Sequence, residues 1–518
     1  MNIKRVLLMV PPVTRPTSYG ADRMRVSPFF PLGLAYLAAV LRERYEVKVL
    51  DCLLEGIERG PQPYGEDAIR YGLRDGDILY QIAKFSPDVV GVSCLFAAQE
   101  WDAKNAARLA KGFIREGGPP LTVLGGPHAG ANAREIMGSE PAVDRVVIGE
   151  GERSFPALLE WEQERASVVD GVAWRCSPEV GDEEGEPHIE IYERGTYIHD
   201  LDSIPLPAWD MLDMGRYARL MQPHDRCRQR PFFVASTSRG CPYNCGFCSI
   251  RGHWGDVPRF RSADNVLAEI EALVTRYGIR EVHFEDDNLT ADRGRALALF
   301  RGMAERFPGL SWAAPSGLAM RNLDDELLDA MAASGCYSVS LAIESGNQGI
   351  LRLMRKPVDL ARVPGLVQEI QGRGMLCKGF FILGYPGETK ATILQTVDFA
   401  KSLQLDWAFF FVASPLPHTD MWDQAKAAGM LAEGDWNPLT SMHEPVLRLP
   451  GIEPEWLVEV REAAMREICF VRNPNILRNP DQAIADFEHV LALYPHFDFA
   501  REALGRAKAR EEAAIEQH

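Results

Sequence analysis

Three cysteines crowd into one short segment of the chain, Ser238-Arg-Gly-Cys-Pro-Tyr-Asn-Cys-Gly-Phe-Cys-Ser249. Cubane iron–sulfur clusters are held by cysteine thiolates, usually four of them. Three thiolates on one tight loop, here Cys241, Cys245 and Cys248, leave the fourth iron without a protein ligand. An open iron can chelate a small molecule, and the cluster can then pass that molecule one electron. The motif therefore predicts a cluster that carries out one-electron chemistry on a bound molecule.

A zinc site and a set of inert core thiols are the two alternatives to a cluster at these cysteines. A structural zinc ion normally takes four ligands in CxxC pairs, and His253 is available as a fourth ligand. Inert thiols would be small core side chains, as we expect for the seven cysteines that lie singly elsewhere in the chain. A disulfide framework is not expected in an intracellular protein of this size. The iron–sulfur cluster is the favoured prediction.

Three further motifs follow the cysteine segment, each at the end of a predicted strand. They are Phe284-Glu-Asp-Asp-Asn288, Leu341-Ala-Ile-Glu-Ser-Gly346 and Phe381-Ile-Leu-Gly-Tyr-Pro-Gly-Glu-Thr389. Taken singly, they are also typical of ordinary structural features: a solvated carboxylate pair, a capped helix start, and a turn with capping residues. Their order after the cysteine loop favours one shared site at the ends of these strands.

Glycines and polar residues mark a second candidate site nearer the N-terminus, again at predicted strand ends. Glycine at such an end lets a ligand approach the backbone. A pair of glycines is weak evidence alone, because any flavodoxin-like domain can show one. The candidate residues are Ser93, Gly125, Gly126, His128, Gly149, Glu150 and Gly151.

The elements that must position these residues alternate between strand and helix. Helical spacing in the N-terminal part is clearest at 34–44 and 101–116. Such alternation is typical of a parallel sheet with helices on both faces, so we expect an α/β domain of the Rossmann-like, flavodoxin-like kind. The predicted strands of this domain are 6–10, 46–50, 88–93, 121–124 and 145–148.

The alternation resumes in the second half of the chain. Six strands joined by helices predict a partial, TIM-like (β/α)6 barrel, whose site lies at the carboxyl ends of the strands. The predicted strands are 232–237, 281–284, 312–314, 338–343, 379–383 and 407–414.

Two regions fall outside this alternation. Residues 170–175 and 188–193 resemble a hairpin around the acidic turn 181–187. The runs 481–494 and 499–515 have amphipathic helical spacing, which predicts a helical cap or an interaction tail. The expected domains are 1–165, a connector at 166–230, the barrel at 231–428 and a helical C-terminal region at 429–518.

The composition narrows the class of protein. Hydrophobic residues make up 46% and charged residues 25%, as in soluble globular proteins. The net charge is 56 − 73 = −17, and an acidic chain repels polyanions, so nucleic acid is not an expected partner. The first apolar run is short and ends at Pro11 and Pro12, and no run approaches the ~20 residues of a membrane span. We expect a cytoplasmic protein of two or three domains.

With Phe247 before its last cysteine, the motif resembles that of the radical S-adenosylmethionine superfamily. The resemblance implies that the three cysteines bind a [4Fe-4S] cluster whose open iron takes the amino and carboxylate groups of S-adenosylmethionine. It also implies an electron donor such as flavodoxin or ferredoxin, and a 5′-deoxyadenosyl radical that removes hydrogen from a substrate. The implied contacts to S-adenosylmethionine are Phe247 beside the adenine, Glu285 and then Asp286 at the amino group, Glu344 and Ser345 at ribose or carboxylate, and Gly384 near the adenine.

The N-terminal glycine motifs and the segment Pro205-Leu-Pro-Ala-Trp-Asp210 are similar to one subfamily, which carries a cobalamin-binding domain before the radical domain. The resemblance covers about residues 3–428. It implies cobalamin as a second cofactor, with Ser93 near the dimethylbenzimidazole tail. The motif Asp-x-His-x-x-Gly, whose histidine ligates cobalt in other cobalamin proteins, is absent, as in many members of this subfamily. We therefore interpret His128 as a residue of the turn or a supporting residue, not as the cobalt ligand.

The two resemblances together imply methylation of an unactivated carbon, or less often phosphorus, in a small metabolite. The nearest alternative is a cobalamin-dependent cyclase or oxidase of the same subfamily. A tRNA methylthiotransferase carries additional N-terminal cluster cysteines, whereas Cys52 and Cys94 are solitary here. A non-catalytic cobalamin or redox sensor is a further alternative, from a different class. No catalytic side chain beyond the cofactor contacts is predicted.

Overall fold

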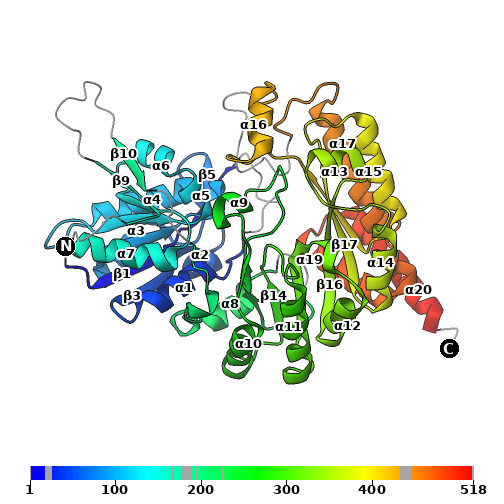
Figure 1. Ribbon diagram of the computed structural model, residues 1–518, viewed down its shortest axis with the longest axis horizontal. Coiled ribbons are helices and arrows are strands. Elements are labelled where there is room, and N and C mark those ends of the chain that lie inside the picture. The colour runs from blue at the N-terminus through cyan, green and yellow to red at the C-terminus, as the bar shows by residue number, and fades with distance from the viewer. Residues whose placement is uncertain are drawn as a thin grey trace. The chain divides into compact units, whose positions relative to one another are not determined.

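The computed structural model describes residues 2–17, 26–164, 169–176, 188–192, 197–223, 227–431 and 445–515. The chain divides into two compact units, residues 1–222 and 223–518, drawn in blue to green and in green to red (Figure 1). The acidic turn predicted at 181–187 lies outside the described residues. Within the described ranges, no helix is both long and apolar enough to span a bilayer.

The first unit is built on a sheet of seven strands. Five of them are parallel and lie in the order β3, β1, β6, β7, β8. Numbered along the chain this is the order 2-1-3-4-5, which is that of flavodoxin-like domains, so the predicted fold is confirmed. The five strands are β1 (Arg5–Val10), β3 (Glu46–Asp51), β6 (Val89–Ser93), β7 (Leu121–Gly125) and β8 (Arg145–Val147).

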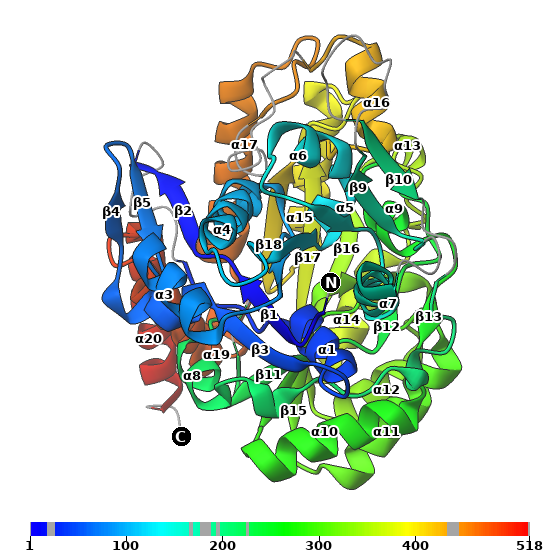
Figure 2. The same ribbon diagram turned by 90° about the vertical axis from the view of Figure 1, so that its left-hand side faces the viewer.

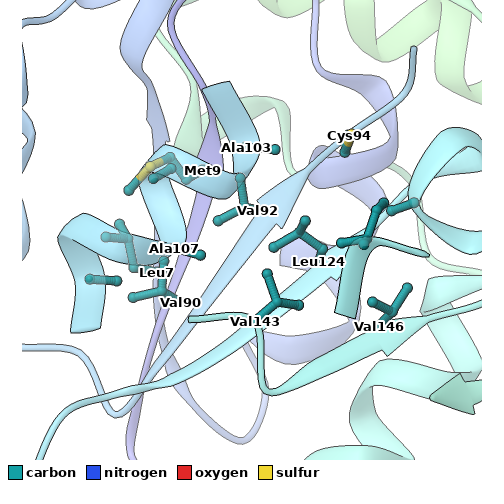
Figure 3. Close-up of a cluster of buried hydrophobic side chains, with 14 of the residues drawn as sticks. Leu7, Met9, Val90, Val92, Cys94, Ala103, Ala107, Leu124, Val143 and Val146 are labelled. Atoms are coloured by element: carbon teal, nitrogen blue, oxygen red, sulfur yellow. The ribbon is translucent and has the colours of Figure 1, made fainter. Parts of the chain in front are cut away.

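Helices cover both faces of this sheet. Successive side chains of a strand point to opposite faces, so each strand packs against helices on both sides. One face, shown in Figure 3, packs against α3 (Asp75–Phe85), α4 (Glu100–Gly112) and α6 (Ala133–Ser139). The other face packs against α1 (Leu32–Leu41) and α7 (Gly151–Glu164). The central strands therefore carry apolar side chains on both faces. The first face carries Leu7, Met9, Val90, Val92, Leu124 and Val146, and the second carries Val6, Leu8, Val89, Val123 and Val147.

The predicted hairpin is present as β9 (Val172–Arg175) and β10 (Ile189–Tyr192). Strand β9 also pairs antiparallel with β8, so the hairpin extends the first sheet instead of standing apart as a separate connector element. A second small sheet, β2–β5–β4, was not expected (Figure 2). Its strands are too short and polar to give a periodic signal: β2 (Val13–Pro16), β4 (Gln62–Tyr64) and β5 (Ala68–Tyr71).

Asp51, at the end of β3, gives the first unit a pH-dependent stability. Its carboxylate accepts hydrogen bonds from the Leu54 amide (2.9 Å) and the Tyr217 hydroxyl (2.7 Å). Burial raises the pKa of Asp51 from 3.8 to about 6. Because the folded-state pKa is the higher one, this contribution to stability is full below pH 3.8 and is lost as pH rises through about 6.

We predict that Asp51→Asn, which cannot titrate and keeps an acceptor oxygen for the Leu54 amide, removes this dependence. Between pH 4 and pH 7.5 the wild type should lose about 2 kcal/mol of unfolding free energy relative to the variant. Urea unfolding of both proteins at the two pH values measures the difference. Equal pH dependence in the two proteins would contradict the prediction.

The second unit contains the six predicted strands, all parallel and in sequential order. Helices α10 (Ala263–Tyr277), α11 (Arg293–Arg306), α12 (Asp325–Ala333), α14 (Val363–Gly372) and α15 (Lys390–Ser402) connect them. This is an open (β/α)6 barrel, as expected. The strands are β11 (Phe232–Ala235), β14 (Glu281–Phe284), β15 (Ser311–Leu318), β16 (Cys336–Glu344), β17 (Leu376–Leu383) and β18 (Trp407–Val412).

The C-terminal region is helical, with α17 (Pro454–Arg466), α19 (Pro480–Leu493) and α20 (Asp498–Ile515), and it covers the edge strand β18. The Cys469 thiol lies 3.4 Å from the Ala408 amide, and Asn473 donates to the Asp406 carbonyl (3.0 Å). Trp407 packs into the apolar core of these helices. An uncovered edge strand is a template for association with other chains, and the tail protects this one.

Candidate functional site

The cysteine loop begins directly after the two-residue strand β12 (Ser238–Arg239). Gly240 has a φ of +84°, which turns the chain into the loop. All three cysteines are half-buried. The middle of the loop is tied down at Gly246, whose amide donates to the Met354 carbonyl (2.9 Å) and whose carbonyl accepts from the Met421 amide (2.8 Å). The loop is thus held from both sides within the second unit.

Three consecutive residues after β14 contact successive residues at the start of this loop. The Asp286 carboxylate accepts from the Thr237 hydroxyl (2.7 Å) and from the Ser238 hydroxyl. The Asp287 carboxylate accepts from the Gly240 amide (2.9 Å). The Asn288 amide nitrogen lies 3.9 Å from the sulfur of Cys241. We call residues 286–288 the clamp.

The surroundings of the thiols suit a bound iron–sulfur cluster. Burial raises the pKa of all three, that of Cys248 to about 11, so thiolates here need a partner that stabilises negative charge. The Tyr243 and Ile250 amides donate to the sulfurs of Cys241 and Cys248, as amides commonly do around such clusters. Across the described ranges, no three His, Cys, Asp or Glu side chains gather closely enough for a metal ion. A four-iron cluster takes its thiolates at separate irons, so it does not require the three sulfurs to converge on one metal ion.

A buried ion pair lies at the end of β16. Lys356 Nζ is 2.9 Å from the Glu344 carboxylate, and Glu344 is only 7% exposed. Glu344 has a φ of +69°, a left-handed conformation that is uncommon for residues other than glycine and clusters at functional sites. The Lys356 charge also opposes the effect of burial on the pKa of Cys241 and Cys245. The pair therefore lies beside the cysteine loop.

The end of β17 is shaped by Glu388. Its carboxylate accepts from the amides of Gly384 (2.7 Å) and Tyr385 (2.9 Å), and burial raises its pKa to about 7. A Cβ on Gly246 of the cysteine loop would lie 2.8 Å from the Tyr385 hydroxyl. The β17 turn and the cysteine loop are thus in close contact.

The structure therefore brings the predicted strand-end motifs of the second unit to the same end of the barrel as the cysteines. The side chains of these motifs differ in their partners. The Asp286 carboxylate accepts the hydrogen bonds of the clamp, and the Ser345 hydroxyl hydrogen-bonds with the Thr396 hydroxyl (3.2 Å) and the Asn347 amide (3.1 Å). Glu285 is half-buried, and its carboxylate lies 3.4 Å from the Ser316 hydroxyl. Phe247 is also half-buried on the loop.

Three residues at this end were missed from the sequence: Asn288, Lys356 and Tyr385. Asn288 and Tyr385 belong to motifs that were singled out, but nothing in those motifs distinguished them from their neighbours. Lys356 lies twelve positions beyond Glu344 along the chain, and only folding brings the two together. An isolated lysine is by default an exposed residue, so no spacing rule selects it.

In the first unit, the candidate residues lie at the carboxyl ends of the parallel strands. Ser93 ends β6 and pairs with Gly125, which ends β7. Gly149 follows β8 with a φ of +83°. In an open α/β sheet this edge is where ligands bind, and the glycines leave the backbone accessible there. The edge fits a cofactor that approaches the backbone.

Other candidates of the first unit have partners within the protein. His128 Nε2 lies 2.6 Å from the Glu100 carboxylate and Nδ1 lies 3.2 Å from the Asn132 amide nitrogen. Through this contact, the pKa of Glu100 falls to about 2. Glu150 accepts from the Ile198 amide (2.7 Å), and a Cβ on Gly151 would meet Leu37 at 3.0 Å. These contacts fit His128 as a residue of the turn. They indicate that Glu150 and Gly151 stabilise the local fold.

Gly126 is required by the packing of two loops. Its φ is +110°, and a Cβ there would lie 2.7 Å from the Cys94 carbonyl oxygen. We predict that Gly126→Ala costs about 1–3 kcal/mol of unfolding free energy and weakens cobalamin uptake, because the β6 and β7 loops must separate. Urea unfolding and the absorbance of bound cobalamin measure the two effects.

Gly118 offers the matched control, because its φ is +97° and a Cβ there would meet nothing within 4 Å. Gly118→Ala should show the cost of the backbone conformation alone and leave cobalamin uptake unchanged. If the two variants behaved alike in both measurements, loop packing would not explain Gly126.

Comparisons with known proteins agree with this arrangement. Residues 235–400 match the model of the radical SAM superfamily, and residues 25–159 match that of the B12 binding domain. The chain is 35% identical to the cytidylyl-2-hydroxyethylphosphonate methyltransferase of Streptomyces wedmorensis, over 87% of this chain and 86% of that protein. It is 32% identical to an uncharacterized methyltransferase of Pyrococcus horikoshii, over 92% of this chain and 94% of that protein.

The fold also matches a solved structure along its whole length. That structure is the radical S-adenosylmethionine methyltransferase TsrM of Kitasatospora setae, with cobalamin and a [4Fe-4S] cluster bound. The TM-score is 0.66 at 18% identity, covering 99% of this chain and 100% of that one. The predicted cofactors, a [4Fe-4S] cluster, S-adenosylmethionine and cobalamin, are those of the two matched domains. The chain belongs to the cobalamin-dependent radical S-adenosylmethionine enzymes and is one of their methyltransferases.

Proposed function

We propose that this enzyme methylates an unactivated carbon, or less often phosphorus, of a small metabolite. The observation that carries the proposal is the grouping, at one end of the barrel, of the cysteine loop, the clamp and the Glu344–Lys356 pair. The Streptomyces wedmorensis relative is named for a small substrate, a cytidylylated hydroxyethylphosphonate. That name supports a small metabolite here also.

In the second unit, we assign Cys241, Cys245 and Cys248 to the cluster. The cluster and cobalamin, when bound, supply one-electron cleavage of S-adenosylmethionine and transfer of a methyl group. Around them the protein binds and orients. The half-buried Glu285 is a carboxylate that can receive the amino group of S-adenosylmethionine, and Lys356, beside Glu344, is a cation that can receive its carboxylate. Phe247 and the Gly384 turn are assigned to the adenine.

In the first unit, we assign cobalamin to the carboxyl edge of the sheet, with Ser93, Gly125 and Gly149 closest to the ligand. Both ring nitrogens of His128 have protein partners, which supports a supporting role and not cobalt ligation. A reductant must supply the electron, and we propose an electron donor such as flavodoxin or ferredoxin. A donor of that kind and an oxygen-labile cluster are typical of a cytoplasmic enzyme.

The test is anaerobic purification with cobalamin, followed by absorption and EPR spectra and an assay with small acceptor metabolites. We expect 5′-deoxyadenosine and S-adenosylhomocysteine together with a methylated product. 5′-Deoxyadenosine without S-adenosylhomocysteine would contradict methyl transfer. Protein that takes up iron and cobalamin but never cleaves S-adenosylmethionine would contradict the assigned site.

A further inference from the structure

The three residues of the clamp contact different groups of the cysteine loop. Asp286 and Asp287 hold the backbone and hydroxyl groups of residues 237–240, and these contacts shape the loop. Asn288 alone reaches a metal ligand, because its amide nitrogen lies 3.9 Å from the sulfur of Cys241. Sulfur is larger than oxygen, so hydrogen bonds to it are longer, and 3.9 Å is at the long end for an N–H donor to a thiolate. The contact joins two strand ends that are 47 residues apart in sequence.

Packing of the clamp does not explain why a polar side chain is buried at position 288. The residue is 2% exposed, and its amide oxygen has no hydrogen-bond partner among the described residues. Burying a polar group without a partner is unfavourable, and an apolar side chain of the same size would avoid that cost. The loop already receives two backbone amides at its sulfurs. At Cys241, Asn288 adds a side-chain donor from outside the loop to the backbone donor at Tyr243.

We propose that Asn288 is a positioning residue that raises the reduction potential of the cluster through Cys241. An N–H donor withdraws electron density from the thiolate, which favours the reduced cluster, and hydrogen bonds to sulfur are a main determinant of iron–sulfur potentials. The cluster must be reduced before it can cleave S-adenosylmethionine, so the donor sets how strong a reductant the enzyme requires. This inference rests on the assignment of Cys241 to the cluster.

The test is an EPR-monitored redox titration of anaerobically reconstituted wild type, Asn288→Leu and Asn288→Gln, without substrate. Asn288→Leu should lower the midpoint potential by up to about 59 mV. For one electron, this shift is a tenfold decrease in the equilibrium constant of reduction. Asn288→Gln keeps an N–H donor and should recover part of the shift. Asn288→Leu with a full cluster and the wild-type potential would overturn the inference.

Thr290 provides a matched control in the same loop. It is fully buried, and its hydroxyl has no hydrogen-bond partner among the described residues. Thr290→Val removes that hydroxyl with almost no change of shape and should leave the potential unchanged. A shift equal to that of Asn288→Leu would mean that any change in this loop moves the potential, and would overturn the specific role of Asn288.

A second measurement applies if Asn288→Leu does not retain the cluster. Pulsed EPR of the reduced wild type, labelled with ¹⁵N in the asparagine side-chain amide, should show a weak nitrogen coupling that is lost in Asn288→Asp. Absence of the coupling from the wild type, or its persistence in the variant, would overturn the inference. A wild type without any cluster signal would instead contradict the assignment of the cysteines, so the two failures are distinct.

Discussion

Cys248→Ala is expected to yield folded protein that holds no [4Fe-4S] cluster and forms no 5′-deoxyadenosine above the level of iron-free protein. Three thiolates already leave one iron open, and alanine cannot replace the thiolate that the substitution removes from a second iron. Folding should survive, because the loop is held by the clamp and by Gly246, and neither depends on this thiol. Iron and sulfide content, the EPR spectrum of the reduced protein and product analysis measure the effect.

Cys176 is the control for general loss of a thiol. It is also a half-buried cysteine, but it lies in the first unit next to β9. Cys176→Ala should keep the full iron content and wild-type cleavage of S-adenosylmethionine. Iron retained by Cys248→Ala at the wild-type level would remove Cys248 from the set of ligands.

Lys356→Met should destabilise the second unit and also slow the reaction. The substitution leaves the Glu344 carboxylate buried without its partner, and breaking a buried ion pair from one side costs about 3–5 kcal/mol. Cleavage of S-adenosylmethionine should fall about 10- to 100-fold, because Lys356 is the cation assigned to the carboxylate of S-adenosylmethionine and a hydrogen bond to a charged group contributes about 1.5–3 kcal/mol. Denaturant unfolding and the rate of 5′-deoxyadenosine formation measure the two effects.

Two further variants separate the buried pair from ordinary lysine chemistry. Lys390 pairs with Glu453 where both side chains are largely exposed, so Lys390→Met should cost no more than about 1 kcal/mol. Adding Glu344→Gln to Lys356→Met removes the unpaired charge and should recover much of the stability but not the activity. Lys356→Met with wild-type stability and activity would show that the pair matters for neither.

The fold could be predicted largely because its signals are local. Most parallel strands of the two sheets contain a short apolar run, since both of their faces are buried, and turn residues bound it. The cysteine loop is likewise local, because its ligands lie within eight residues. The helical tail was visible from its periodicity, but its place on β18 was not. That placement depends on contacts such as that between Cys469 and Ala408, and no sequence pattern in either segment predicts this contact.

The candidate site divides in the same way. The sequence by itself determined which motifs take part, because the carboxyl ends of the strands in a parallel α/β fold form the edge where ligands bind. Only the tertiary structure decided what each side chain does there. Neighbouring residues such as Glu285 and Asp286 point in different directions, and the packing of the cysteine loop selects Asp286 for the clamp. The same packing brings Asn288 to Cys241 and Lys356 to Glu344, contacts between segments that are distant in sequence or separated by a turn.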